Sequence, residues 1–424
     1  MKKNRIIAGI ELGSSKISTI ISQVSEDATT QETLINIVGV SASEAKGIRK
    51  GQIVDIEEAV ESIISSVEGA ERMAGYNLNS AIVAIGGAHI HSQNSHGVVA
   101  VSDPEGEISP DDINRVIEAA SAISLPQSRE VIHVIPSEFI VDGETGVKDP
   151  VGMSGVRLEV ETHIVTAASA SIKNIKKALN EVGIEIESMV FSGLAAGEAV
   201  ASSTEKELGC AVVDMGGGTT SVAAYIDGSL SYSGVIPIGA RNVTNDLAIG
   251  LRVSLEAAEK IKIALSQEGK KKSKDKEDAD SDQVELTDLG VSDSKRVSKK
   301  TLIEGIIRPR LNEIFTMVRI ELDKANLANR IPSGVIICGG GAETVGAAES
   351  AKRMLSLPVR VGVPKGIGGL IDDIVNPAFA TNVGLIVYGS KLGVRQKEGL
   401  GAKFKISSMG FFGKIVDSVR NLLP

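Results

Sequence analysis

Two short segments of the chain share an order of residues that suits the binding of a phosphate chain. In each, an acid ends an apolar run and turn-forming residues follow: Gly13, Ser14, Ser15 and Lys16 after Glu11, and Gly216, Gly217, Gly218, Thr219 and Thr220 after Asp214. A turn of this kind aims successive backbone N–H groups at an anion, and glycine lets the backbone approach it closely. An acid beside phosphate would repel it, so Glu11 and Asp214 predict a divalent cation, Mg²⁺, held through water.

A third glycine cluster and an internal repeat strengthen this interpretation. The third cluster follows the apolar residues 334–338 and consists of Gly339, Gly340 and Gly341, with Ala342 next. Residues 6–20 (IIAGIELGSSKISTI) resemble residues 210–224 (CAVVDMGGGTTSVAA). In this match Glu11 corresponds to Asp214. A single glycine turn is more often a plain turn, but two in a duplicated context and a third after a strand favour a nucleotide site.

The elements that must position these turns alternate between strands and helices. We expect strands at residues 6–10, 17–21, 34–40, 81–85, 163–168, 186–191 and 334–338, a strand-turn-strand unit at 210–225, and helices at 56–74, 171–182, 194–202 and 300–327. Such alternation is typical of an α/β protein with a doubly wound sheet. Residues 89–161 differ, with short strands, turns rich in glycine and proline, and a helix that begins at Pro110 after Ser109 as N-cap. They predict a small inserted subdomain.

Composition narrows the classes of function. The net charge of -9, the absence of tryptophan and an aromatic content of 3% argue against nucleic-acid binding. Cys210 and Cys338 lie in apolar runs without metal-ligand spacing, as expected in a reducing compartment. The sequence contains no run of eighteen apolar residues, so we expect no membrane span. Residues 268–282 carry eleven charged residues in fifteen and predict a solvated loop.

The last residues predict an amphipathic helix that lies on an anionic membrane surface. At 100° per residue the apolar side is formed by Phe411, Phe412, Ile415, Val416, Val419, Leu422 and Leu423, and the polar side includes Lys414 and Arg420. From Lys391 onward seven Lys and Arg residues face two acids, which favours anionic lipid. Residues 399–409, dominated by glycine, serine and lysine, predict a flexible tether. A helix that packs on its own domain is the alternative.

The three glycine segments, in this order, resemble the two phosphate loops and the adenosine loop of the actin-like ATPases. Residues 256–264 resemble the helix that offers an acid to the ribose and a lysine to the adenine, which implies these roles for Glu259 and Lys262. The resemblance also implies that Gly239 contacts the nucleotide. Residues 193–201 and 377–389 resemble the two helices that cross between the domains.

Residues 133–166 are similar to the inserted subdomain of the FtsA family of bacterial cell-division proteins, and the resemblance runs from Ile6 to Leu423. It implies ATP and Mg²⁺ as cofactors, self-association into filaments, binding of the carboxy-terminal tail of the tubulin-like FtsZ, and a peripheral position on the cytoplasmic side of the cell membrane at the division septum. Arg296, Lys299 and Lys300 would then receive the acidic partner tail, and a solvated charge run is the alternative.

The same resemblance implies a division of the chain into subdomains. It assigns residues 1–84, 165–192 and 367–392 to subdomain 1A, 85–164 to the inserted subdomain 1C, 193–245 and 313–366 to subdomain 2A, 246–312 to subdomain 2B with a disordered charged loop at 268–296, 393–408 to a flexible linker, and 409–424 to the membrane-targeting helix.

Hydrolysis and two other functions complete the expectations. In the resemblance, the residue that orients the attacking water falls on Ser192, which is a poor base, so we expect firm ATP binding with at most slow hydrolysis. Glu11 stands where many actin-like proteins carry aspartate. The alternatives are a pilus-assembly actin-like adaptor, which normally lacks the terminal amphipathic helix, and a sugar-kinase-like phosphotransferase, for which no aspartate stands where a substrate base is needed.

Overall fold

The computed structural model describes residues 5–26, 33–272, 282–285, 287, 296–370 and 374–397. The chain divides into two compact units, Met1–Ser390 and Lys391–Pro424, and the following description concerns the first. Residues 398–424, which include the whole predicted tether (399–409), most of the predicted linker (393–408) and all of the predicted membrane helix, lie outside the described residues. Within the described part, no helix is both long enough and apolar enough to cross a bilayer.

The first half of the fold is built on a mixed six-stranded sheet. Its order is β11-β6-β1-β2-β3-β19, with β1 (Arg5–Leu12), β2 (Lys16–Glu26), β3 (Thr33–Glu44), β6 (Ser80–Ile85), β11 (Glu185–Phe191) and β19 (Gly368–Gly369). β1 pairs antiparallel with β2 and parallel with β6. Apolar runs form these strands because both faces are covered: α1 (Ile56–Ala74) packs against Gly39, and α11 (Ala380–Lys397) packs against Gly9 on the opposite face. Helices lie on both faces, as predicted, but the β1–β3 meander makes the sheet mixed.

The second half repeats this arrangement. Its sheet has the order β14-β13-β12-β17-β18, with β12 (Cys210–Met215), β13 (Thr220–Ile226), β14 (Ser229–Ile236), β17 (Val335–Cys338) and β18 (Val359–Val361). β12 pairs antiparallel with β13 and parallel with β17, as β1 does with its neighbours. The helical elements of this half are α6 (Arg241–Leu251), α7 (Leu255–Lys272), α8 (Lys299–Leu302), the π-helical turn η2 (Ile303–Ile307), α9 (Arg308–Lys324), the 3₁₀ turn η3 (Gly340–Glu343) and α10 (Ala347–Leu355). The repeat inferred from the two glycine segments is therefore a repeat of the fold.

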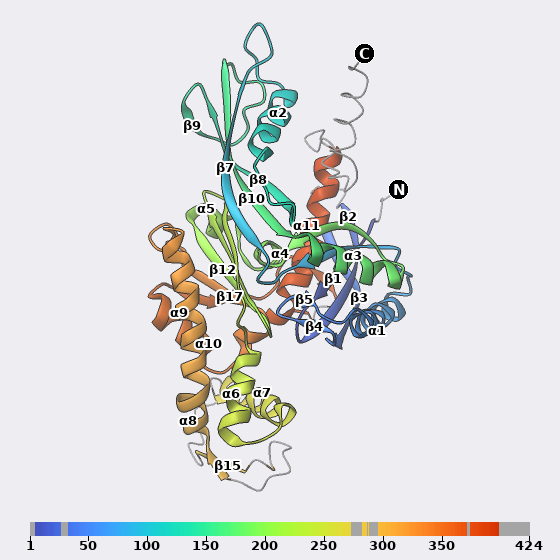
Figure 1. The fold of residues 1–424 in the computed structure, drawn as a ribbon, viewed down its shortest axis with the longest axis vertical. Helices are drawn as coiled ribbons and strands as arrows, with labels where there is room; N and C mark the ends of the chain where they lie inside the picture. Colours follow the sequence, from blue (N-terminus) through green and yellow to red (C-terminus); the bar gives the residue numbers. More distant parts are fainter. Residues whose placement is uncertain are drawn as a thin grey trace. The chain divides into compact units, whose positions relative to one another are not determined.

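The inserted subdomain is a four-stranded antiparallel sheet with one helix. It consists of β7 (His91–Ala100), α2 (Pro110–Ser121), β8 (Arg129–Val141), β9 (Glu144–Val147) and β10 (Arg157–Ala168), in the sheet order β7-β10-β8-β9 (Figure 1). Its small core includes Ile108, Val116 and Leu158. Ser109 caps α2 in a capping box with Asp112, which confirms the predicted start of this helix.

The strand expected at residues 163–168 belongs to this inserted sheet and not to the first sheet. β10 pairs with β7 and β8 along its length, up to Ala168, and α3 (Ser169–Val182) follows directly. Local alternation predicts a strand but does not tell which sheet the strand joins. The inserted sheet also contacts the second half of the fold: His163 Nε2 lies 3.0 Å from Ser233 Oγ, and Ser92 Oγ donates to the Ser233 carbonyl at 2.7 Å.

The charged segment predicted as a loop from residue 268 is helical at its start and contains a strand. α7 continues to Lys272, because lysine and glutamate are good helix formers, and β15 (Gln283–Glu285) pairs with β16 (Arg296–Ser298). Apart from residues 282, 287 and β16, the rest of this segment lies outside the described residues. The helix predicted at residues 300–327 is divided into α8, η2 and α9.

Two helices cross between the halves at very short distance. α4 (Ser192–Val200) and α11 meet where a Cβ atom added to Gly384 would lie 1.7 Å from the Ala195 carbonyl oxygen. Glycine at position 384 is required because any side chain would push the crossing helices apart.

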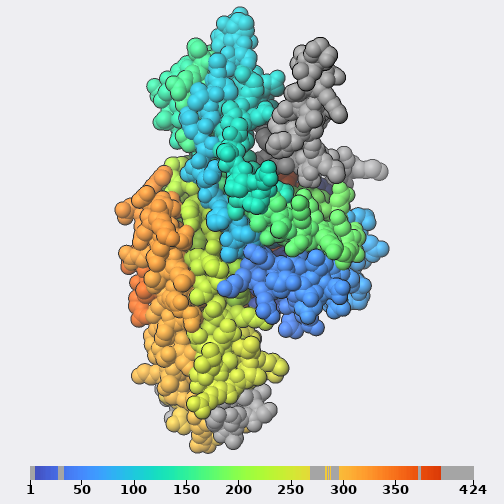
Figure 2. Space-filling view, in the orientation of Figure 1, coloured from blue at the N-terminus to red at the C-terminus, as the bar shows by residue number. Residues whose placement is uncertain are grey.

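The remaining short elements are β4 (Ile48–Arg49), β5 (Gln52–Ile53), α5 (Ser203–Leu208) and the 3₁₀ turn η4 (Pro377–Phe379). On the face drawn in Figure 2, the blue surface of the first strands and α1 adjoins the yellow-green surface of the second half.

We therefore predict that Gly384→Ala destabilises the protein. Overpacking at a buried crossing should lower the free energy of unfolding by about 1–3 kcal/mol, measured by urea denaturation followed by circular dichroism. Gly305→Ala is the matched control, because Gly305 is also helical and an added Cβ meets nothing within 4 Å. Equal stability of the two variants would contradict the close approach.

Candidate functional site

A cavity of about 880 Å³ lies between the two halves of the first unit. Its wall brings together most of the residues predicted from the sequence: Glu11, Gly13, Ser14, Ser15 and Lys16, then Asp214, Gly216, Gly217, Gly218 and Thr219, the cluster Gly339, Gly340 and Gly341, and Glu259 and Lys262 of α7. Thr220, Gly239 and Ala342 do not line it. Thr220 is fully buried and donates to the Ile238 carbonyl, Gly239 packs behind the second turn against the Gly216 carbonyl, and Ala342 is buried in the second core.

The two glycine turns have the same local geometry and face each other. Each is closed by one backbone hydrogen bond: Gly13 N donates to the Lys16 carbonyl at 3.1 Å, and Gly216 N donates to the Thr219 carbonyl at 2.9 Å. A Cβ atom added to Gly217 would lie 1.8 Å from Ser15 Oγ. The second turn therefore approaches the first so closely that a side chain at position 217 would displace the Ser15 hydroxyl.

The two acids lie at matching positions at the ends of β1 and β12. The pKa of Glu11 is raised to about 7, chiefly by burial; the charge of Lys16 opposes this shift, the charge of Asp214 adds to it, and a hydrogen bond from Ser18 opposes it. Burial also raises the pKa of Asp214, against the lowering effects of a hydrogen bond from Thr381 Oγ1 (2.9 Å) and of Lys16. A bound cation would reverse both shifts, because it stabilises the ionised carboxylates.

The donor set fits Mg²⁺ with phosphate more closely than a metal held by protein alone. In the described parts of the chain, no group of three or more histidine, cysteine, aspartate and glutamate residues could hold a metal ion. Two carboxylates, with water and phosphate oxygens completing the shell, are the usual surroundings of Mg²⁺. Glu11 and Asp214 would hold the ion, and it would neutralise phosphate charge.

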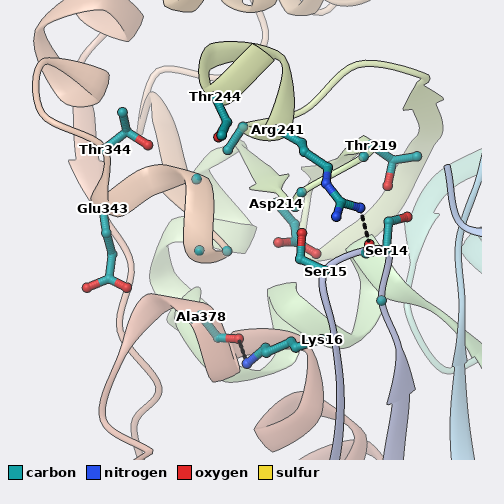
Figure 3. A pocket seen from close by; sticks show the side chains of 18 of the residues that line it. Ser14, Ser15, Lys16, Asp214, Thr219, Arg241, Thr244, Glu343, Thr344 and Ala378 are labelled. Carbon is teal, nitrogen blue, oxygen red and sulfur yellow. Dashed lines mark hydrogen bonds between the residues drawn. The ribbon is translucent and has the colours of Figure 1, made fainter. Parts of the chain in front are cut away.

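Lys16 points toward the start of α11. Its ammonium donates to the Ala378 carbonyl at 2.6 Å and lies 3.6 Å from the centroid of the Phe379 ring (Figure 3). Burial lowers the pKa of Lys16, while the negative charges of Glu11 and Asp214 act in the opposite direction. The lysine that the sequence assigns to the phosphates thus also joins the first turn to η4, which precedes α11.

At the α7 side of the cavity, Lys262 and Glu259 bind each other. Lys262 Nζ lies 2.8 Å from Glu259 Oε2 and 2.9 Å from Thr244 Oγ1, and Thr244 also donates to Glu259. Polar groups of this kind can hydrogen-bond a ribose and a base. Ser192 lies on the wall as well, with its hydroxyl 3.0 Å from Ser221 Oγ.

Several lining residues were not found from the sequence: Arg241, Thr244, Glu343, Thr344, Asn376 and Ala378. Glu343 and Thr344 come one residue after the third glycine cluster, and their closeness to it in the sequence is a signal that could have identified them. Arg241 and Thr244 belong to α6, whose start has no side-chain cap. No local pattern marks them, because the tertiary fold places them at the cavity.

Comparison with solved structures identifies the class of fold. A type IV pilus biogenesis complex, PilM-PilN, matches with a TM-score of 0.63 and 15% identity over 91% of this chain and 98% of that chain. MreB 5 of Spiroplasma citri bound to AMPPNP matches with a TM-score of 0.52 and 14% identity over 93% and 99%. At these identities the likeness concerns the fold alone. The duplicated two-domain architecture is the actin-like fold.

Sequence relatives identify the family within that class. Residues 87–166 match the SHS2 domain inserted in FtsA, and residues 211–384 match the family model of cell division protein FtsA. Cell division protein FtsA of Pseudomonas aeruginosa is 36% identical over 408 residues, which cover 96% of this chain and 94% of the relative. FtsA of Bacillus subtilis is 36% identical over 417 residues, with 96% and 90% covered. This chain belongs to the FtsA family of cell division proteins, as the resemblance of the inserted segment predicted.

The raised pKa of Glu11 predicts a pH-dependent gain in stability for Glu11→Gln in the nucleotide-free protein. A carboxyl group whose pKa rises from 4.5 when unfolded to about 7 when folded destabilises the fold as pH rises through that window. The side chain is half-buried because it lines the cavity, so screening should limit the gain at pH 8 to about 1–2 kcal/mol, with none at pH 4.

Thermal unfolding at pH 4, 6 and 8 measures this effect. Glu44→Gln, at an exposed position on the wall of the same cavity, is the control for loss of one carboxylate. A pH-independent difference between Glu11→Gln and the unmodified protein would contradict the prediction.

Proposed function

We propose that this protein binds ATP with Mg²⁺ between its two glycine turns, assembles into filaments, and anchors FtsZ filaments to the cytoplasmic face of the cell membrane during Z-ring assembly. The observation that carries the nucleotide part is the meeting of two like turns on one cavity wall, each preceded by an acid whose pKa is raised by burial. Its volume of about 880 Å³ lies in the range of small-molecule sites. Membership of the FtsA family and an actin-like relative solved with AMPPNP support the proposal.

Each part of the wall has a place in this proposal. Backbone N–H groups of the two glycine turns hold the phosphates, and Glu11 and Asp214 hold Mg²⁺ through water. Glu259, Lys262 and the third glycine cluster surround the adenosine. When bound, Mg²⁺ neutralises phosphate charge.

Hydrolysis should be slow because the position that would orient the attacking water holds neither an acid nor an amide. The family resemblance assigns this position to Ser192, whose hydroxyl lies 3.0 Å from that of Ser221. A serine hydroxyl without a basic partner takes up a proton poorly at neutral pH. ATP would therefore serve mainly to fix the relation of the two halves.

Membrane attachment is proposed from the sequence of residues 409–424. Seven apolar side chains at about 1.5 kcal/mol each would contribute roughly 10 kcal/mol at most. Ordering some fourteen residues costs about 1 kcal/mol or more apiece, so one helix alone would bind weakly and reversibly. Several copies held in one filament would insert at high effective concentration, and attachment would become firm.

The FtsZ tail is proposed to bind near the start of α8. Arg296 lies there, and it already forms an ion pair with Glu285, with 2.6 Å between Arg296 Nη2 and Glu285 Oε1. Lys299 and Lys300 follow after Ser298, which caps α8. An acidic peptide would replace Glu285 as the partner of the Arg296 guanidinium. The electrostatic cost would be small because the Arg296–Glu285 pair is exposed.

We predict that Gly217→Ala weakens ATP binding about tenfold or more, which corresponds to about 1.4 kcal/mol. The added methyl would meet Ser15 Oγ and Cβ and would hold the two turns apart. Ser15→Gly removes both contacting atoms, so the double variant Ser15→Gly/Gly217→Ala should regain at least part of the affinity. Isothermal titration with ATP and Mg²⁺ measures it, and an unchanged affinity of Gly217→Ala would show that the turn is structural only.

We further predict that the full chain co-sediments with anionic vesicles and that a chain ending at Ser408 does not. Val416→Asp should release the protein, because it places a charge on the apolar side of the predicted helix. Ser418→Asp adds the same charge on the polar side and should pellet nearly as well as the unmodified chain. Equal pelleting of the full and shortened chains would overturn the anchor.

A further inference from the structure

Arg241 joins the two glycine turns across the cavity. It begins α6 directly behind the second turn, where its backbone N donates to the Gly217 carbonyl at 2.8 Å. Its side chain reaches the first turn, where Nη1 donates to the Ser14 carbonyl at 3.1 Å (Figure 3). One residue is thus attached to one repeat through its backbone and to the other through its guanidinium.

The guanidinium keeps charge and donors available for an anion. Of the described residues, three cationic side chains line the cavity, and two are engaged. Lys262 pairs with Glu259, and Lys16 lies in the field of Glu11 and Asp214 and bonds to a carbonyl. Among the residues that the structure describes, no carboxylate forms an ion pair with Arg241. A guanidinium has five N–H donors, and a carbonyl contact leaves its positive charge uncompensated.

A planar guanidinium with free donors binds a phosphate through two parallel hydrogen bonds. A phosphate held between the two turns lies beside the group that spans them. We propose that Arg241 contacts the terminal phosphate of the bound nucleotide and thereby sets the preference of this site for a nucleoside triphosphate over a diphosphate. The inference rests on the proposed ATP binding, and it assigns the discrimination between triphosphate and diphosphate to one side chain.

A merely structural role for Arg241 makes a different prediction. If the side chain only connects the two turns through the Ser14 carbonyl, its loss loosens the contact between the two halves around any nucleotide. The affinities for ATP and for ADP would then fall together. A contact with the terminal phosphate affects only the ligand that carries this phosphate.

The test compares Arg241→Gln and Arg241→Lys with the unmodified full chain. Dissociation constants for ADP and for a non-hydrolysable imido analogue of ATP, both with Mg²⁺, are measured by competition against a fluorescent nucleotide. Arg241→Gln should weaken binding of the triphosphate analogue about tenfold, as expected for loss of one charge-assisted contact, and change ADP binding by less than about twofold. Arg241→Lys should fall between, because lysine keeps the charge but lacks the planar fork.

Arg72→Gln is the charge control, since it removes one positive charge from an exposed site on α1 that is remote in sequence from both turns. Thermal melting of each nucleotide-free variant verifies that it is folded. An equal loss for both nucleotides, or no loss for either, would overturn the role of Arg241 while leaving ATP binding intact. Failure of the unmodified protein to bind either nucleotide would overturn the proposed function itself.

Discussion

Two carboxylates at matching ends of the two repeats, Asp214 buried and Glu11 half-buried, are the constraint on which this fold depends. Burial raises the pKa of both Glu11 and Asp214, and the compensation that the described residues offer is modest: the charge of Lys16, a hydroxyl from Ser18 and a hydroxyl from Thr381. Keeping acids in such a place costs free energy unless a cation relieves it. A phosphate-bound Mg²⁺ would relieve both at once. Because one acid comes from each repeat, the ion that relieves them would also fix how the repeats lie together.

The start of α11 connects this charge cluster to the crossing of the two halves. Lys16 donates to the Ala378 carbonyl, Thr381 donates to Asp214, and Asn382 donates to the Ser18 carbonyl at 2.7 Å. A few residues further, Gly384 contacts the backbone of α4. The first residues of α11 thus bond to the strands that lead into the second turn and out of the first, and the same helix packs closely against α4. Small displacements of these strand ends would be transmitted to the crossing, because close-packed interfaces cannot deform gradually.

The sequence predicts the parts of this arrangement that are encoded locally. Apolar runs ending in an acid and a glycine turn specify β1-β2 and β12-β13, and Ser109 marks the start of α2. It does not specify partners that are distant along the chain. Residues 163–168 alternate like any half-buried strand, and only pairing with β7 and β8 assigns them to the inserted sheet. Arg241 follows no motif, because its position at the cavity depends on how α6 packs behind the second turn.

Lys16 illustrates why residue type alone does not fix a role. Its spacing after Gly13 predicts contact with phosphate, yet its ammonium bonds to Ala378, which is 362 residues away in sequence. Both interactions use the same three donors, so a phosphate that attracts Lys16 competes with the first residues of the α11 region for it. The lysine therefore has two partners of different kinds, one intrinsic and one brought by the nucleotide. If Lys16 moved from the Ala378 carbonyl to a phosphate, η4 and the start of α11 would be bound less tightly to the first turn. The nucleotide state would in this way affect the crossing of the two halves.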